Sequence, residues 1–387
     1  MWPSVVVYTV TALILFGLGW HVSVREQKSL ALGGKQLPFY SWEILLSILL
    51  FSVVAGMRYG TGFDHLMYLR QYQFCQEGHT LYRQFELGFA VFTKGLARLG
   101  FHYSIYFGLL ALVQISLLYY GLNHKKQLLP WFGALLMTSW LFLYLMNTIR
   151  EGIVVCLLVA LVPWVQQKRY LWLVLVFLAA VLIHTSALLV IPIVFLAANV
   201  NIDKVKIQWL LLVYFACVIL GQFPDWIRFL LMPLRDVTHM AGYDVYIDDI
   251  NKMLSNGFRS IPWGPSNIKT FLMGIITIVF YGTLKKWTED RYLPIYFFLF
   301  FLGLCFEALM INTNHYVLRA FDYFRVFSVI LTAYLLLYLW EARRWMWFIA
   351  VAVLNFSYIY FEIFKSVHYP SSTNWATLYH FFFLTGI

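Results

Sequence analysis

The stretch LWLVLVFLAAVLIHTSALLVIPIVFLAA, residues 171–198, decides how the rest of the chain is arranged. It contains no Asp, Glu, Lys or Arg, and its 28 residues exceed the roughly 20 apolar residues that cross a bilayer. His184, Thr185, Ser186 and Pro192 interrupt it. It is therefore either one tilted membrane helix or two short helices, and the two alternatives place all later segments on opposite sides of the membrane.

Basic residues choose between these alternatives, because Lys and Arg collect in the loops on the cytoplasmic side. If the stretch is split, all the basic clusters fall on one side: Arg25/Lys28/Lys35, Lys125/Lys126, Lys168/Arg169, Lys204/Lys206, Lys285/Lys286/Arg291 and Arg343/Arg344. An unbroken helix inverts every later cluster. The sequence therefore predicts two short segments, with His184 near their outer junction and both termini outside.

The composition of the whole chain is that of a membrane protein. Of its 387 residues, 61% are hydrophobic and 12% are charged, and the mean hydropathy is +0.73. Soluble domains carry about 25% charged residues. A helix satisfies its own backbone hydrogen bonds in lipid, so helices are the expected elements. The net charge of +10 lies in short loops, and positive-inside topology explains it better than a nucleic-acid partner.

We predict an all-α integral membrane protein with about twelve transmembrane helices in one polytopic domain, residues 1–387. Two longer outer loops are expected at about 58–103 and 223–267. The apolar runs lie at about 2–22, 42–57, 104–121, 130–147, 150–165, 171–184, 187–198, 207–222, 268–284, 293–311, 321–341 and 344–362.

Four groups of polar residues stand at the predicted outer ends of these runs. In the first, residues 58–64 (RYGTGFD) follow the second run, and Tyr68 and Arg70 come one to two turns later if Asp64 begins a helix. The glycines allow a tight turn and a close approach of the backbone to a ligand. An interfacial anchor at Arg58 and a helix N-cap at Asp64 explain the same pattern without a ligand.

The second and third groups lie at short outer turns. Arg150 and Glu151 begin a run with almost no loop before it, where ionisable groups are costly and usually paired or functional. A structural contact between the two is the alternative. His184 lies beside the expected helix break, as a functional group or as a hydrogen-bonded core residue.

The fourth group, residues 319–325 (RAFDYFR), begins the eleventh run. In a helix it places Arg319, Asp322 and Arg325 on neighbouring turns. Arginine forks bind phosphate oxygens bidentately, so several arginines at an outer cavity indicate a diphosphate ligand. An internal network of ion pairs is the alternative.

No metal or nucleotide cofactor is expected. The outer loop 223–267 carries several Asp residues and one His, but Asp248 and Asp249 are adjacent and their side chains point apart. No Asp-x-Asp pair or His cluster has the spacing of metal ligands. No Walker A or dinucleotide-binding glycine loop is present either.

In these same four places the chain resembles the EpsG/Wzy family of polysaccharide polymerases. The likeness rests on residues 58–64 with Tyr68, on Arg150, on residues 184–187 (HTSA) and on residues 319–325, in order over most of the chain. It implies a multi-pass enzyme of the bacterial inner membrane whose active site faces the periplasm. The implied substrate is an undecaprenyl-diphosphate-linked oligosaccharide within membrane lipid. A flippase and a chain-length regulator are the implied protein partners.

The resemblance implies transfer of a growing glycan from its lipid diphosphate to a sugar hydroxyl of the next unit, which builds O-antigen or exopolysaccharide. The arginines that would stabilise the leaving diphosphate without a metal are Arg58, Arg150, Arg319 and Arg325. The residues expected to contact the substrate elsewhere are Tyr68, Arg70 and Tyr323. The candidates for the general base are Asp64, His184 and Glu151.

The fold is expected to be similar to that of large membrane glycosyltransferases that use lipid-phosphate donors. Many of those enzymes carry an Asp-x-Asp pair in the first outer loop, and its absence here disfavours a metal-dependent mechanism. A lipid-linked glycan ligase would use the same arginines. A flippase or transporter is the third interpretation, but it favours charged residues at both leaflets, whereas here they gather on the predicted outer face.

Overall fold

The computed structural model describes residues 1–79, 85–223, 263–312, 315–368 and 377–384, with the backbone alone for residues 315–321. Apart from turns and one antiparallel bridge between Arg58 and Phe381, the regular structure of these residues is helical. The chain divides into two compact units. The first comprises Met1–Val200 with Val326–Ile387, and the second comprises Asn201–Arg325.

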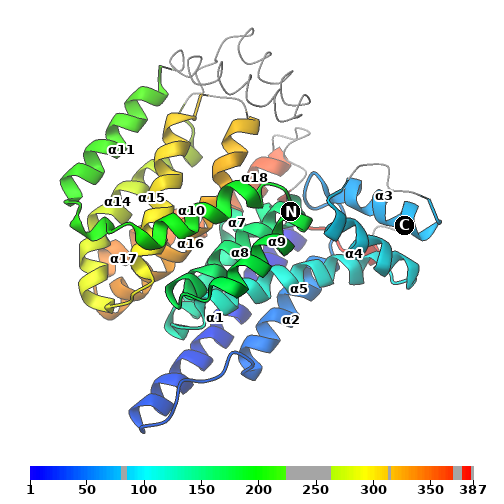
Figure 1. Ribbon diagram of the computed structural model, residues 1–387, viewed down its shortest axis with the longest axis horizontal. Helices are drawn as coiled ribbons and strands as arrows, with labels where there is room; N and C mark the ends of the chain where they lie inside the picture. Colours follow the sequence, from blue (N-terminus) through cyan, green and yellow to red (C-terminus); the bar gives the residue numbers. More distant parts are fainter. Residues whose placement is uncertain (80–84, 224–262, 313–314, 369–376, 385–387) are drawn as a thin grey trace. The chain divides into compact units, whose positions relative to one another are not determined.

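The first unit is built around α8 (Ile149–Gln166), which is buried over most of its length and contacts α5, α7, α9 and α10 (Figure 1). A second layer consists of the pairs α1–α6 and α2–α5. The bounds of the other elements are α1 Trp2–Ala31, α2 Trp42–Gly56, α3 His65–Gln76, α4 Leu87–Arg98, α5 Tyr103–Leu122, η1 Lys126–Leu128, α6 Leu129–Thr138, α7 Trp140–Asn147, α9 Tyr170–Ile183, α10 Ala187–Asn199, α16 His315–Glu341, α17 Trp345–Phe356, α18 Tyr358–His368 and η5 Phe382–Leu384.

The stretch 171–198 is two helices, as the sequence predicted. Helix α9 ends at Ile183, and His184 follows in an extended conformation with φ −156° and ψ 125°. Helix α10 begins at Ala187. The backbone N–H of His184 still bonds to Ala180, so His184 terminates α9 and lies in the turn between the two helices.

Two predicted segments have more structure than expected. The run 130–147 is broken into α6 and α7, which are bent by 64°. Ser139 causes the break, because its backbone is extended and its hydroxyl accepts a hydrogen bond from Leu141 N–H at 3.2 Å, which caps α7. The expected outer loop 58–103 contains α3 and α4, and α3 starts directly after Asp64, which meets the condition on which the sequence analysis placed Tyr68 and Arg70.

The described residues contain six helices long and apolar enough to cross a membrane, or seven if the bent pair α6–α7 forms one span. The protein is therefore a multi-pass membrane protein. Five further apolar helices, α2, α9, α10, α11 and α15, have 13–17 residues. A perpendicular crossing needs roughly 20 residues, so the count of twelve spans stays a prediction.

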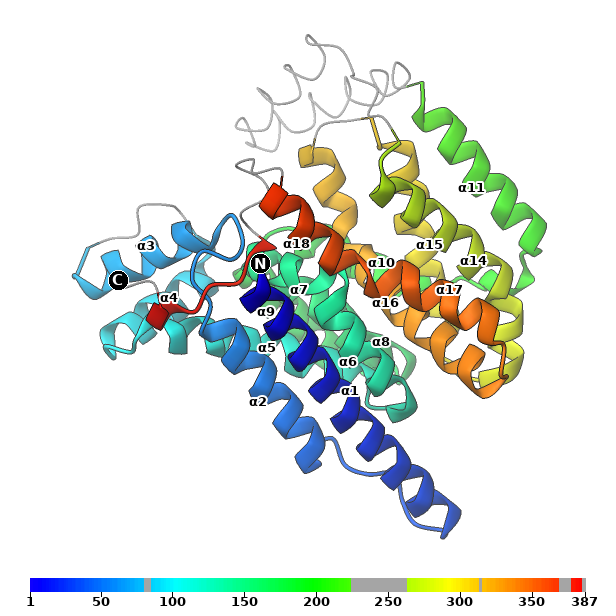
Figure 2. The ribbon, with the colours of Figure 1, turned by 180° about the vertical axis from the view of Figure 1, so that it is seen from behind.

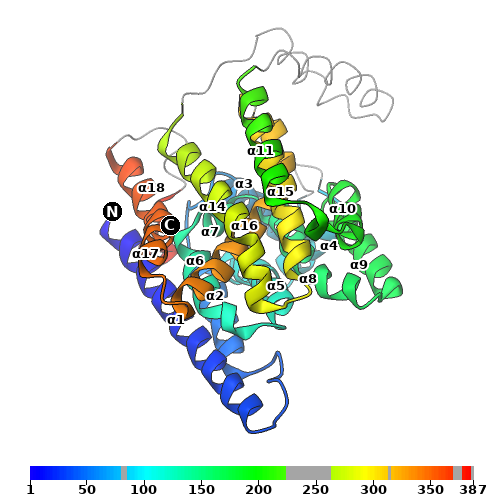
Figure 3. The same ribbon diagram turned by 90° about the vertical axis from the view of Figure 1, so that its left-hand side faces the viewer.

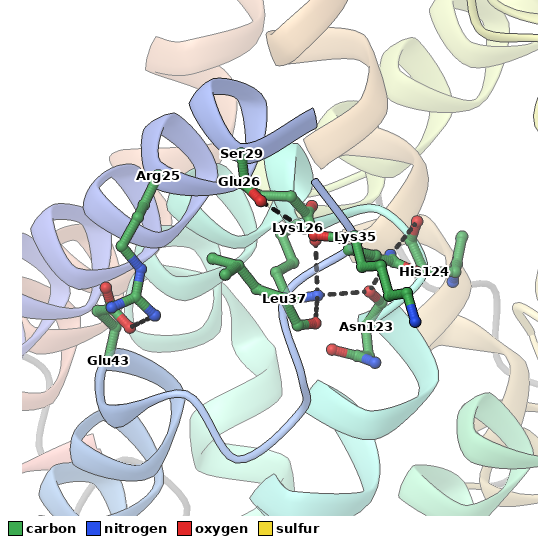
Figure 4. A network of polar contacts seen from close by, with 10 residues as sticks. Arg25, Glu26, Ser29, Lys35, Leu37, Glu43, Asn123, His124 and Lys126 are labelled. Atoms are coloured by element: carbon green, nitrogen blue, oxygen red, sulfur yellow. Dashed lines mark hydrogen bonds and ion pairs between the residues drawn. The ribbon is translucent and has the colours of Figure 1, made fainter. Parts of the chain in front are cut away.

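The helices of the first unit have two distinct ends. The end that holds residues 57–64, the start of α5 and the start of α8 is called the motif end. The opposite end, called the basic end, holds the basic clusters of this unit. Its network is drawn in Figure 4: the buried Lys126 Nζ donates to Glu26 Oε1 at 2.8 Å and to Leu37 O at 2.8 Å, and Arg25 pairs with Glu43 at 3.0 Å.

The C-terminal segment 377–384 is part of the motif end (Figure 2). Tyr59 N–H donates to His380 O at 2.7 Å and Phe382 N–H donates to Met57 O at 3.0 Å. The hydroxyl of Tyr379 donates to Val54 O at 2.6 Å. These bonds hold the end of α2 and the loop after it against the C-terminal segment.

The second unit contains three helices that lie side by side (Figure 3): α11 (Ile207–Gly221), α14 (Pro265–Thr288) and α15 (Leu293–Leu309). It also contains η2 (Ile202–Lys204) and the start of α16. Asp203 accepts a hydrogen bond from Tyr281 Oη at 2.5 Å and pairs with Lys285. The two basic clusters of this unit therefore share one end of its helices, as the positive-inside rule requires.

Candidate functional site

Glu86 joins the polar residues at the motif end of the first unit. Its Oε1 accepts a hydrogen bond from His184 Nδ1 at 2.8 Å and one from the backbone N–H of Thr185 at 3.3 Å. Its Oε2 accepts a hydrogen bond from Arg150 Nη1. One carboxylate thus brings together Arg150 and His184, which lie on different helices.

Each of these three side chains is placed by a helix terminus. Glu86 is the N-cap residue of α4, Arg150 lies in the first turn of α8, and His184 is the C-cap residue of α9. Helix α4 packs directly on α9. Gly88 permits the contact, because a Cβ atom there would lie 2.9 Å from the carbonyl oxygen of Leu182.

Aromatic rings form a wall around Arg150. Its guanidinium carbon lies 4.8 Å from the ring centroid of Phe85 and 5.8 Å from that of Phe89. Its Nε donates to the hydroxyl of the buried Tyr68 at 3.3 Å. Tyr68 is thereby brought to the site. Arg70 lies on the same helix as Tyr68, α3, and its side chain is exposed. Its guanidinium has no hydrogen-bond or ionic partner within the described parts of the chain.

The ionised Glu86 carboxylate determines which ring nitrogen of His184 donates a hydrogen bond to it. Burial by itself raises the pKa of Glu86, but the hydrogen bond from His184 and the charge of Arg150 outweigh it and lower the pKa to about 2. An ionised carboxylate only accepts hydrogen bonds, so Nδ1 of His184 carries the proton. Nε2 of His184 has no hydrogen-bond partner among the residues that the structure describes. The His184 side chain is 23% exposed.

Arg58, the first arginine of residues 58–64, is almost fully buried at 1% exposure. Its Nη1 donates to Ala55 O, its Nε to Thr61 O at 3.3 Å and its Nη2 to Met146 O at 3.2 Å. These three carbonyls belong to the end of α2, the loop after it and α7. This geometry favours a structural role for Arg58 over contact with a diphosphate.

Asp64 and Glu151 make contacts near the α7–α8 junction. The backbone N–H of Asp64 donates to Asn147 Oδ1 at 2.9 Å, which ties the start of α3 to the α7–α8 junction. The partly exposed Asp64 carboxylate makes no hydrogen bond within the described residues. The buried Glu151 accepts a hydrogen bond from Tyr144 Oη at 2.8 Å.

The late candidates lie in the second unit. Arg325 Nη1 donates to Asp322 Oδ1 at 2.9 Å, and its Nε lies 3.8 Å from Glu307 Oε2. Arg325 thus takes part in the internal ion pairs that the sequence offered as the alternative. Tyr323 is buried. Arg319 lies on α16, and its side chain is outside the described residues, as are Asp248 and Asp249.

A sequence model of the EpsG family matches residues 41–379, which include the Glu86 cluster and residues 58–64. The chain belongs to the EpsG family. The resemblance inferred from the motifs is thus confirmed. No curated protein and no solved structure matches the chain. EpsG membership indicates a glycosyltransferase-like role in polysaccharide polymerisation.

Sequence reasoning missed Glu86, the residue that joins Arg150 and His184 in this candidate site. It overlooked one signal: Glu86 directly precedes the apolar segment Leu87–Arg98 within a stretch taken as a loop. A negative charge at the start of a helix is favoured by the helix dipole. The pairing with His184, 98 positions later, leaves no trace in the spacing of the chain.

Proposed function

We propose that this EpsG protein polymerises lipid-diphosphate-linked oligosaccharide units into O-antigen or exopolysaccharide at the periplasmic face of the inner membrane. The glycan on undecaprenyl diphosphate is transferred to a sugar hydroxyl of the next lipid-linked unit. One observation carries this proposal: the Glu86 carboxylate holds a histidine and an arginine together at one end of the helices.

The histidine supplies the general base of the proposed reaction. The attacking hydroxyl gives its proton to Nε2 of His184 while its oxygen forms the new bond to the anomeric carbon. Glu86 keeps Nδ1 protonated and fixes the plane of the ring. Of the three base candidates, His184 is favoured, because Glu86 orients its ring, whereas the Glu151 carboxylate accepts a hydrogen bond from Tyr144 and the Asp64 carboxylate has no hydrogen-bond partner among the described residues.

The arginine supplies charge for the leaving group. The bond between the anomeric carbon and the diphosphate oxygen breaks, and the oxygen takes the electron pair. Arg150 is pre-positioned by Glu86 and Tyr68, and the remaining donors of its guanidinium have no partner among the described residues. Fixed donors in a water-poor site stabilise such developing charge strongly.

The test uses the purified full chain in nanodiscs with lipid-linked repeat units, and the products are separated on a gel. His184→Ala should lower the rate of polymerisation by about 10²–10⁴-fold, the usual contribution of a general base. Lys285→Ala, in the second unit, is the matched control and should polymerise normally. A His184→Ala variant that is as active as the wild type would refute the assignment of the base.

A gene deletion separates the polymerase from its alternatives. Surface glycan of a single repeat unit supports the polymerase. Loss of all surface glycan would indicate a flippase, and polymer that stays on its lipid carrier would indicate a ligase.

Independence from divalent metal is part of the same proposal. Arg150 would supply the charge that Mg²⁺ or Mn²⁺ supplies elsewhere. The purified enzyme should therefore polymerise in excess EDTA at close to its untreated rate. Loss of activity in EDTA, restored by Mg²⁺ or Mn²⁺, would contradict this.

A further inference from the structure

Helices α3 and α4 pack on each other at the motif end, and together they are called the α3–α4 pair (Figure 1). Their inner faces carry Tyr72, Phe89 and Ala97, which belong to one apolar core with residues of α5 and α8. The hydroxyl of Tyr72 donates to Phe101 O at 2.7 Å, which ties α3 to the segment just before α5. The pair therefore has one face on the protein and one face turned away from it.

Both ends of α4 are fixed beside the ends of apolar helices. At its start, Gly88 lies against the backbone of Leu182, at the end of α9. Its last residue, Arg98, is followed after residues 99–102 by α5, which is long and apolar enough to cross a membrane. Leu182 on α9 and Ile105 on α5 are exposed apolar side chains, as expected of a lipid-facing surface. The whole of α4 therefore lies near the level at which the lipid-facing helices end.

The outward face of α4 is one narrow stripe of exposed side chains. Leu87, Val91, Lys94 and Arg98 fall within about 60° of one another, because each residue of a helix turns by about 100°. Leu87 is 67% exposed and Val91 is 61% exposed. Basic side chains next to apolar ones suit a helix at a membrane surface, where Lys and Arg extend toward the headgroups and the apolar residues enter the acyl boundary.

Three cations of the pair lack counter-charges in the protein. Arg70, Lys94 and Arg98 are exposed, and none has a hydrogen-bond or ionic partner within the described parts of the chain. The two glutamates of this segment are engaged elsewhere: Glu77 lies 3.8 Å from a neighbouring histidine, and Glu86 holds the cluster described above. Headgroup phosphates would supply the matching negative charge, since Arg and Lys near a membrane surface attract anionic lipids.

Other occupants fit this face less well. Water would leave the large exposed aliphatic side chains of α4 without an apolar partner. A second copy of the chain, related by two-fold symmetry, would place the same cations against each other. An acidic soluble protein would match the charge but would meet apolar side chains at the level of the lipid surface. Anionic phospholipid matches the charge, the apolar side chains and the level together.

We propose that the α3–α4 pair lies on the leaflet at the motif end and binds anionic phospholipid. The apolar residues of the α4 stripe would enter the acyl boundary, and Arg70, Lys94 and Arg98 would bind headgroup phosphates. This assignment goes beyond the proposed function and does not depend on it. Because Glu86 is the N-cap residue of α4, the leaflet would also hold the Glu86 cluster at a fixed depth.

The depth of α4 is measured on the full chain in nanodiscs of phosphatidylcholine and phosphatidylglycerol. Val91→Cys is labelled with the fluorophore NBD, which lipids with a doxyl group high on the acyl chain quench at short range. The four native cysteines are buried, which favours labelling of the new site. Lys35→Cys, in the exposed loop after the 30-residue α1, is the matched control in water. The label at Val91→Cys should be quenched several-fold more strongly.

Two results of this measurement would overturn the proposal. Equal quenching at the two sites would place α4 in water. Efficient disulfide cross-linking of two chains through Val91→Cys would place a second copy on this face.

The headgroup contacts are tested by comparing doxyl-labelled phosphatidylglycerol with doxyl-labelled phosphatidylcholine as quenchers of the same label. With the three cations present, the anionic lipid should quench more strongly, because each cation enriches it up to about fivefold at low salt. High salt should weaken this preference. The test variant replaces the three cations of the pair by glutamine: Arg70→Gln, Lys94→Gln and Arg98→Gln. It should lose the preference.

A matched control removes the same charge from exposed cations at the basic end: Lys28→Gln, Lys35→Gln and Arg169→Gln. This control should keep the preference for the anionic lipid at the Val91→Cys label. Equal quenching by the two lipids with all cations present, or a preference that survives in the test variant, would overturn the headgroup contacts and with them the proposal.

Discussion

At the scale of single residues, Arg58 and Arg150 both stand at the end of an apolar run, but their surroundings in the structure differ. Arg58 is buried and donates to three backbone carbonyls, whereas Arg150 pairs with one carboxylate and keeps unused donors. Arg58 follows an apolar run and Arg150 begins one. The resemblance to the family implied that both stabilise the leaving diphosphate. Side-chain surroundings, which the sequence does not display, separate them.

This difference predicts opposite results for the same substitution. Arg58→Lys leaves at least one carbonyl without a donor, at about 1–3 kcal/mol for each buried group. It should lower the melting temperature and the yield of folded protein in detergent. Arg150→Lys should melt like the wild type but lose most polymerisation, because an ammonium ion cannot bind Glu86 and a phosphate in a planar fork. Normal stability of Arg58→Lys would return Arg58 to the diphosphate role.

The lowered pKa of Glu86 predicts that the stability of the folded protein depends on pH. Its pKa falls from the ordinary 4.5 to about 2 in the folded protein. A lowered carboxyl pKa contributes stability that is complete above pH about 4.5 and is lost as the pH falls through about 2. Glu86→Gln should therefore be less stable than the wild type near neutral pH, by on the order of 2 kcal/mol. Melting curves from pH 7 to pH 2 should show this difference shrinking only below pH about 4.5, and a difference constant down to pH 2 would contradict the ion cluster.

At the scale of elements, the loop between α2 and α3 depends on two glycines with positive φ. Gly62 has φ +95°, and a Cβ atom there would lie 2.9 Å from Met146 O. Gly60 has φ +68°, and a Cβ atom there would meet nothing within 4 Å. The two positions have the same kind of backbone and different neighbours, so they form a matched pair.

Gly62→Ala should be more damaging than Gly60→Ala. Both variants carry the cost of a left-handed residue, about 1–2 kcal/mol. Gly62→Ala in addition pushes the loop away from α7 and disturbs the bond between Asp64 and Asn147. Thermal melting and polymerisation should both fall further in Gly62→Ala. Equal effects of the two substitutions would show that the contact with Met146 carries no weight.

At the scale of the whole molecule, the distribution of charge predicts the topology, and the structure identifies positions suitable for testing that prediction. Lys126 belongs to a predicted cytoplasmic cluster, but its side chain is 0% exposed and bonded to Glu26. A cysteine at that position would resist labelling on either side of the membrane. The four native cysteines are also buried, which gives a low background.

Exposed positions give a clear prediction. Glu77→Cys, at the motif end, should be labelled by an impermeant maleimide in intact spheroplasts. Arg169→Cys, at the basic end, and Lys286→Cys, in the second unit, should react only after permeabilisation, because Lys and Arg remain on the cytoplasmic side. Labelling of Arg169→Cys from outside would invert the first unit and remove His184 from the periplasmic face. Lys286→Cys tests the second unit separately.

The sequence by itself determined the membrane class, the helix break at His184 and the family. Hydropathy and charge are sums over local segments, and a helix start such as Asp64 is set by neighbours within a few positions. Only the tertiary structure decided which polar residues act together. Glu86 meets His184 and Arg150 because α4 packs on α9 and α9 adjoins α8. That packing depends on side chains far apart in the chain, such as Gly88 against Leu182, and local patterns carry no record of such contacts.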